Sequence, residues 1–240
     1  MSIQEKLTTI AENEQKVYDK GKADGKSAEW NALWDAFQQL GERNNYINAF
    51  SSRDGRARTA WTKETFKPKY DINATKSAEA LFDRSTNLDI DLVEWLENLG
   101  ITLNTKGATS MYFAFYGTVF TRLPVIDLSS ANNTAYCFNY NVKCTKIDKI
   151  ICSANTAWHS STFDFANLEE CIFEGVIGSN NFNLSKCTKL NRESLLTAIN
   201  CFDDYSGTTT KRTATFGTTN LDKLTDSEKA IATQKGWTLA

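Results

Sequence analysis

Few residues of this chain could carry out catalysis. It holds a single histidine, His159, so zinc coordination and histidine-based acid–base chemistry have almost nothing to draw on. Residues 21–27 (GKADGKS) have the glycines and lysine of a phosphate-binding loop, but three residues instead of four separate the glycines and no apolar strand precedes them. The GxGxxG, GxSxG and HExxH motifs are absent. The sequence therefore predicts no catalytic residue, no cofactor and no metal site.

Paired carboxylates are the one enzyme-like feature that remains. The pairs are Asp89 with Asp91, Glu169 with Glu170, and Asp203 with Asp204. A glycosidase needs two acids at a defined separation across the scissile bond, and a sequence does not give that separation. Neighbouring acids on a strand or turn are usually solvated. A glycan-active enzyme that uses Glu169 and Glu170 therefore stays as an alternative.

Six cysteines could in principle form disulfides. They are Cys137, Cys144, Cys152, Cys171, Cys187 and Cys201. They are confined to one region of a long chain, recur at matching places of a repeat, and include no CxxC pair. We interpret them as buried thiols that pack as small apolar side chains.

The composition is that of a folded chain with no strong charge bias. Of its 240 residues, 41% are hydrophobic and 23% are charged, and the net charge is -2. Nucleic-acid-binding proteins usually carry a clear basic excess. The N-terminus is polar, without a signal-peptide pattern, and no run of about 18 apolar residues occurs. We therefore expect no nucleic-acid partner, no membrane insertion, and synthesis in the cytoplasm without a signal peptide.

The elements that would position any site come from a repeat. Four segments, at 120–128, 144–152, 165–173 and 187–195, share the pattern [F/C]-x-x-[L/I]-x-x-φ-x-φ, in which φ is apolar. Their anchors Leu123, Ile147, Leu168 and Leu190 follow one another at steps of 24, 21 and 22 residues. The fourth copy has Glu193 at its first φ position, and a degenerate earlier copy spans residues 81–92.

A period in the low twenties with apolar residues in a short strand is typical of a leucine-rich-repeat solenoid. We predict an α+β fold: a short leucine-rich-repeat solenoid with a parallel sheet, preceded by N-terminal helices and closed by a C-terminal cap. The repeat domain spans residues 78–240 and its cap residues 195–240. A second interior ladder should be formed by residues about ten positions before the anchors, which are Phe113, Cys137 and Trp158. In the cap we expect a helix at 193–199, strands at 213–217 and 237–239, and a helix that opens with a capping box at 225–228.

The N-terminal part is a predicted attachment or oligomerisation segment, residues 1–45, followed by a connecting loop at 46–77. Ile3, Leu7, Ile10 and Val17 follow an a/d spacing. A second amphipathic helix over residues 30–40 ends at Gly41. Two heptads are too few for a lone coiled coil, so the first helix is expected to dock or to oligomerise.

The repeat strings resemble a known family. Cys-Thr-Lys-Ile at 144–147 and Cys-Thr-Lys-Leu at 187–190 are similar to BspA-type leucine-rich repeats. The strings VYDKGK (17–22), WDAF (34–37), FKPKYDI (66–72) and GWTL (236–239) resemble a group of proteins common in gut Firmicutes and their prophages. This resemblance implies a phage tail, baseplate or fibre component that resides in the virion.

A binding role follows from the predicted concave sheet face, where residues between the apolar anchors should be exposed. The candidate binding residues are Asp127, Asp148, Lys149, Glu169, Glu170 and Arg192. Acids, bases and aliphatic residues mix on this face, as on protein-binding surfaces, without the aromatic row of a sugar platform.

We therefore expect a non-enzymatic structural protein with protein partners. The partners would be copies of itself, a trimer being one arrangement, other virion proteins, or a host-surface receptor. A bacterial interaction or adhesion module is the alternative within the binding class.

Overall fold

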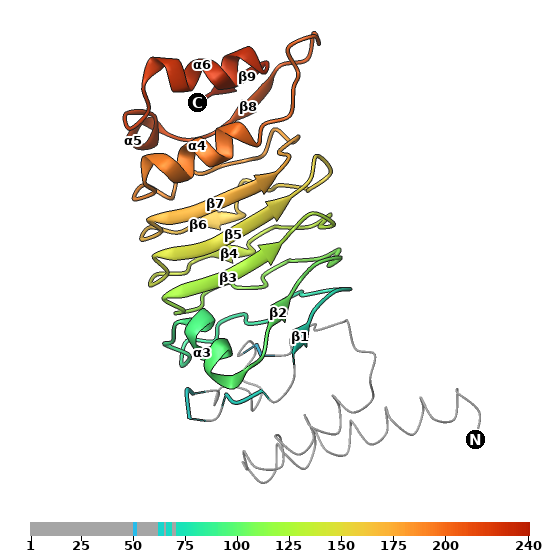
Figure 1. The fold of residues 1–240 in the computed structure, drawn as a ribbon, viewed down its shortest axis with the longest axis vertical. Helices are drawn as coiled ribbons and strands as arrows, with labels where there is room; N and C mark the ends of the chain where they lie inside the picture. Colours follow the sequence, from blue (N-terminus) through green and yellow to red (C-terminus); the bar gives the residue numbers. More distant parts are fainter. Residues whose placement is uncertain (1–49, 52–61, 65, 69–70) are drawn as a thin grey trace, which may run out of the picture.

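The computed structural model describes residues 50–51, 62–64, 66–68 and 71–240. The chain winds in successive coils that lie one above the next along the long axis (Figure 1). Its elements are, in order, β1 (Ile72–Asn73), α3 (Leu92–Leu99), β2 (Leu103–Asn104), β3 (Arg122–Asp127), β4 (Phe138–Asn139), β5 (Lys146–Cys152), β6 (Phe163–Asp164), β7 (Glu170–Gly175), α4 (Arg192–Asn200), β8 (Arg212–Ala214), α5 (Thr218–Leu221), α6 (Asp226–Gln234) and β9 (Trp237–Leu239).

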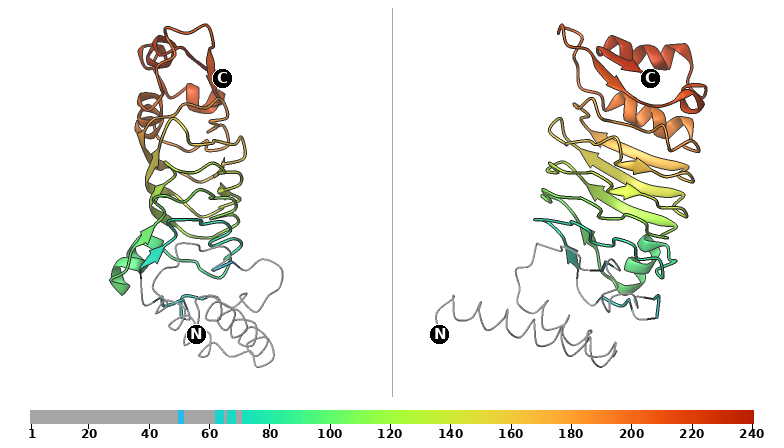
Figure 2. Two further views of the ribbon diagram at one scale, coloured as in Figure 1. Left: turned by 90° about the vertical axis from the view of Figure 1, so that its right-hand side faces the viewer. Right: turned by 180° about the vertical axis from the view of Figure 1, so that it is seen from behind.

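All strand pairs within the described residues are parallel, so each coil binds the next by backbone hydrogen bonds. β3, β5 and β7 form a three-stranded sheet along one wall of the stack, and β4 and β6 pair on the opposite wall (Figures 1 and 2). β1 pairs with β2, and β8 pairs with β9. The predicted mixed fold of helices and strands with a parallel sheet is thus confirmed.

The repeat pattern identifies the buried residues correctly but places the third copy in the wrong register. Leu123, Ile147 and Leu168 are all buried. The residue that aligns with Leu123 and Ile147 is, however, Cys171 and not Leu168. Apolar residues recur every three positions from Phe165 through Leu168 to Cys171, so a slip of three residues keeps the first apolar positions, and an irregularity in the strand pairing then brings Phe173 opposite Ile150. The inter-strand hydrogen bonds select one register, in which β7 begins at Glu170.

The fourth copy, expected partly as a strand, lies at the edge of the sheet and forms helix α4 after residue 191. The Asn191 side chain accepts a hydrogen bond from the Ser194 backbone N–H at 2.8 Å, which starts the helix. Glu193 would put a charge into the core of a strand, whereas in the first helical turn it is favoured by the helix dipole. The predicted helix at 193–199 is confirmed.

Hydroxyl groups close both edges of the three-stranded sheet. On the β7 edge, Ser194 Oγ accepts the Cys171 N–H at 2.9 Å and Thr197 Oγ1 accepts the Phe173 N–H at 3.1 Å. On the β3 edge, Thr105 Oγ1 accepts the Asp127 N–H at 2.8 Å. Edge amides left open would recruit another strand or stay unsatisfied. These hydroxyls therefore end the sheet.

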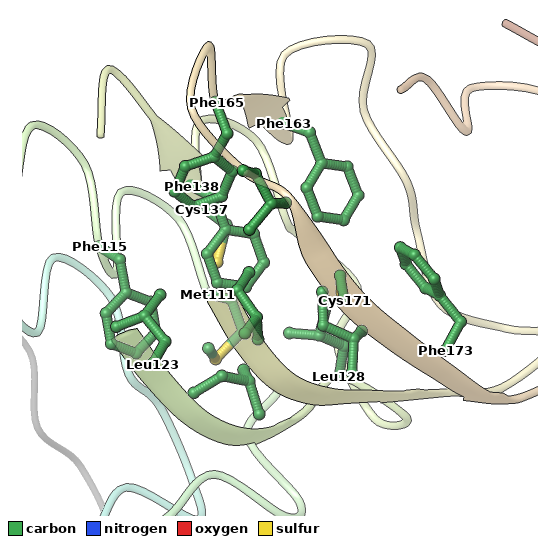
Figure 3. Close-up of a cluster of buried hydrophobic side chains, with 14 of the residues drawn as sticks. Met111, Phe115, Leu123, Leu128, Cys137, Phe138, Phe163, Phe165, Cys171 and Phe173 are labelled. Carbon is green, nitrogen blue, oxygen red and sulfur yellow. The ribbon is translucent and has the colours of Figure 1, made fainter. Parts of the chain in front are cut away.

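A column of phenylalanine rings fills the interior. Successive rings of Phe50, Phe82, Phe115, Phe138 and Phe163 stack with centroids 5.0, 5.7, 5.6 and 5.4 Å apart and planes within 23° of parallel. The last three are seen in Figure 3. Phe50 comes from the predicted connecting loop, so the described part of that loop contributes to the core.

The second interior ladder was predicted correctly at two of its three positions. Cys137 and Trp158 are buried, but Phe113 is only half-buried and Phe115 takes the interior position. The reason is a left-handed backbone at Phe113, with φ of 56°, which turns its side chain away from the core.

The C-terminal cap follows the sequence-based expectation. The Thr225 side chain accepts the Glu228 N–H while the Glu228 carboxylate accepts the Thr225 N–H, which is the predicted capping box of α6. The strand predicted at 213–217 is β8, two residues shorter, and the strand predicted at 237–239 is β9. No helix among the described residues is long and apolar enough to cross a membrane.

The six cysteines are free thiols and all are buried, as expected. Burial raises the pKa of Cys144, Cys152 and Cys187 to about 12 and raises that of Cys137, Cys171 and Cys201 as well. Their role in the described coils is packing, because the reactive thiolate is strongly disfavoured.

Replacing Thr197 by valine should destabilise the protein, because the new side chain keeps the shape but leaves the Phe173 N–H without an acceptor. We expect Thr197→Val to lower the free energy of unfolding by about 1–3 kcal/mol in urea titrations. The matched control is Thr233→Val, at an exposed position of α6. Equal effects of the two substitutions would contradict the role of Thr197 as an edge cap.

Stability should also fall at alkaline pH. Unfolded thiols ionise near a pKa of about 8.5, whereas the pKa values of Cys144, Cys152 and Cys187 reach about 12 in the folded chain. Their contribution is therefore complete below about pH 8.5 and is lost as the pH rises toward the folded values. Urea titrations between these limits measure the slope, and Cys144→Ala/Cys187→Ala should make it shallower. An unchanged slope in that variant would contradict the assignment.

Candidate binding surfaces

The predicted binding residues do not form one surface. Asp127, Asp148, Lys149 and Glu170 lie on strands of the three-stranded sheet, and Glu169 directly precedes β7. Arg192 is the first residue of α4 and points to the cap, where its guanidinium donates two hydrogen bonds to the Glu228 carboxylate.

The charges on the sheet pair with one another across neighbouring strands. Arg122 Nε and Nη2 donate to the two oxygens of Asp148 at 2.7 and 2.9 Å. The other two pairs are Lys146 with Glu170 at 2.8 Å and Lys149 with Glu174 at 2.6 Å. The hydrogen bond to Asp148 raises the pKa of Arg122. These residues therefore tie the coils together, and the sheet presents little unpaired charge to a partner.

Of the remaining predicted residues, Asp127 has a local structural role, whereas the contacts define no role for Glu169. Asp127 accepts hydrogen bonds from Ser129 N–H at 2.8 Å and Ser129 Oγ at 2.6 Å, which fixes the turn after β3. Glu169 is exposed and pairs with no charged side chain of the described residues. Val125 and Ile172, 42% and 47% exposed, are the large apolar side chains open to solvent on this sheet.

The paired acids are mostly engaged in structural contacts. Asp91 caps α3 by accepting the Val93 and Glu94 backbone N–H groups at 2.9 and 3.0 Å. Asp89 pairs with Lys143 at 2.5 Å. Asp204 accepts hydrogen bonds from Ser206, which lower its pKa.

The single histidine has a local hydrogen-bond partner. His159 Nδ1 lies 2.8 Å from Ser161 Oγ on the surface. Among the described residues, no three His, Cys, Asp or Glu side chains converge in a way that could hold a metal ion.

A second surface was missed by the sequence reasoning, which looked for exposed aromatic residues only on the sheet. An aromatic strip crosses successive coils near β4, on the wall opposite the sheet, and consists of Tyr112, Phe113, Tyr116, Tyr136, Tyr140 and His159. Tyr136 and Tyr140 are 36% and 60% exposed. A signal was present in the sequence, because tyrosines recur 24 residues apart at 112 and 136 and at 116 and 140, although the coils match Tyr136 with Phe113 and Tyr140 with Gly117.

The strip is built on an unusual backbone. Phe113, Tyr136 and Tyr140 have left-handed φ angles of 56°, 56° and 58°, and Arg84 has 56°. Gly117, with φ of 61°, lies in the same region and has no Cβ to clash. Bulky residues pay about 1–2 kcal/mol for this conformation. The chain thus keeps aromatic side chains where glycine would be less strained.

Ring contacts order the strip. Phe113 and Tyr136 stack with centroids 5.0 Å apart and planes 10° from parallel. Tyr140 contacts Tyr116 edge to face at 5.4 Å, and the Arg84 guanidinium lies 5.7 Å from the centre of the Tyr116 ring. A half-exposed row of tyrosines with one arginine has the composition of a protein-binding hot spot.

Comparisons with models of known protein families, with curated proteins and with solved structures give no match to this chain.

Removing one sheet charge should have a small effect, because the pairs are partly solvated. We expect Asp148→Asn to lower the free energy of unfolding by less than about 1 kcal/mol. The loss should shrink in about 1 M NaCl, where such pairs are screened. Urea titration measures both, and Glu169→Gln is the control for an unpaired acid. A loss that did not respond to salt would contradict an ion-pair role.

Proposed function

We propose that the chain is a non-enzymatic binding protein, a short leucine-rich-repeat solenoid that acts as a structural component of a phage virion. The solenoid reading is supported by the parallel coils, whose strands β3, β5 and β7 align at 24-residue steps from Leu123 through Ile147 to Cys171. The virion assignment rests on the resemblance of the sequence strings.

The aromatic strip is the observation that carries the binding role. Buried side chains and inter-coil ion pairs account for most of the other distinctive residues, but stability does not require exposed rings on strained backbone. Strain of this kind is typically kept where a side chain serves function. Protein partners are favoured because tyrosine and arginine are enriched at the centre of protein interfaces.

The N-terminal segment supplies the proposed attachment. Its a/d residues Ile3, Leu7, Ile10 and Val17 lie outside the residues that the structure describes, so the oligomerising helix stays a prediction. In this arrangement residues 1–45 join the chain to itself or to a virion protein, and the coils carry the contact surface outward.

Two rivals are distinguished by simple observations. A bacterial interaction or adhesion module would share the binding surface but would not sediment with phage particles. A glycan-active enzyme would hydrolyse a host-surface polysaccharide, and Glu169→Gln/Glu170→Gln would abolish that activity. The ion pair of Glu170 with Lys146 at 2.8 Å favours a structural role for that acid instead.

Gradient-purified phage particles should contain the chain, detected by an antibody and counted against the major capsid protein. We expect Leu7→Asn/Ile10→Asn to remove it from particles, because two polar residues on the predicted seam disrupt helix association. Asn13→Gln, a polar position of the same segment, should be incorporated normally.

Light scattering of the same three full-length proteins reports their solution mass. An oligomer that only the seam variant loses supports self-association through residues 1–45. Wild-type chain absent from particles, or a seam variant incorporated as well as wild type, would contradict the proposed attachment.

A further inference from the structure

We infer that Arg84 and the neighbouring tyrosines of the aromatic strip bind an exposed carboxylate on a protein partner. The inference rests on the proposed binding function and names the chemistry that the partner must offer. The proposed contact site lies on the wall of the coil stack opposite the charged sheet.

Arg84 has the free hydrogen-bonding capacity that such a site needs. Its side chain is 50% exposed, and its guanidinium donates no hydrogen bond to any described residue. Arg84 Nε forms an ion pair with the buried Asp83 carboxylate at 3.9 Å, which is too long for a hydrogen bond, so the guanidinium N–H donors remain open to a second carboxylate. A guanidinium offers several N–H donors in a planar fork that matches the two oxygens of a carboxylate.

A glycine, Gly117, separates Arg84 from Tyr140 in the stack of coils. Arg84, Gly117 and Tyr140 occupy matching left-handed positions of successive coils. At the middle position a side chain is missing, and a Cβ there would lie 3.5 Å from Arg84 Cγ. Tyr116 links the two side chains, because its ring centre lies 5.7 Å from the Arg84 guanidinium and 5.4 Å from the centre of the Tyr140 ring.

The combination of Arg84 with half-exposed tyrosines favours a peptide over a sugar. One face of the Tyr136 ring is occupied, because this ring stacks on Phe113 with planes 10° apart. Ring edges carry the positive part of the aromatic quadrupole and attract oxygen atoms. Together with Arg84, they favour a carboxylate flanked by peptide carbonyl groups.

The test is an array of decamer peptides of varied sequence, each carrying one glutamate and paired with its glutamine counterpart, probed with the full-length chain. We expect wild type to bind a set of the glutamate peptides about tenfold more tightly than their glutamine partners. Arg84→Gln should reduce this ratio to about one. The matched control is Arg212→Gln, since Arg212 also stacks on a tyrosine, 4.6 Å from the centre of the Tyr205 ring, but in the cap.

Tyr140→Gly separates a binding role from a structural one. Glycine relieves the left-handed φ of 58°, so the midpoint of thermal unfolding should stay the same or rise while peptide binding weakens. A ring kept only for packing would instead lower the midpoint.

Three outcomes would overturn the inference. They are equal binding of glutamate and glutamine peptides, the same loss in Arg212→Gln as in Arg84→Gln, and binding of acidic glycans but of no peptide on a parallel array. None of these changes the particle and light-scattering results, so a failure here is distinguishable from a failure of the proposed function.

Discussion

Each coil is bound to the next by parallel backbone hydrogen bonds, and the rest of the structure depends on this link. Thr145 N–H donates to Thr121 O, Glu169 N–H to Thr145 O, and Asn191 N–H to Glu169 O, at 2.8–3.0 Å. A single coil cannot bury its own apolar side chains. Holding the coils in register lets their phenylalanine rings stack in one interior column, so backbone pairing and core packing stabilise each other.

A stack of this kind must end without open edges, and the chain solves the problem with helices and hydroxyls. α3 precedes the sheet and α4 follows it, and Thr105, Ser194 and Thr197 accept the amides that a further strand would have taken. The same regularity that builds the core also brings surface residues into rows. Charged residues on the sheet form rows of ion pairs, and aromatic residues on the opposite wall form the strip.

The two rows differ in what they imply. Ion pairs between coils satisfy each other and add a modest amount to stability, so they leave little capacity for a partner. The strip keeps half-exposed tyrosines and a guanidinium at solvent on a backbone that costs energy to maintain. The strip is therefore the wall on which we propose binding, whereas Asp148, Lys149 and Glu170 are engaged in ion pairs between coils.

By itself the sequence determined that the repeat anchors are buried, because the apolar pattern recurs along the chain, and it determined the capping box at Thr225. Tertiary structure decided the register of the third copy, since the observed alignment depends on an irregularity in the strand pairing between Ile147 and Ile150 that the repeat pattern does not show. It also decided that Phe115, and not Phe113, faces the core, because a left-handed φ at one residue reverses a side chain. The strip, finally, needed both the register and that backbone turn, which only the contacts between coils fix.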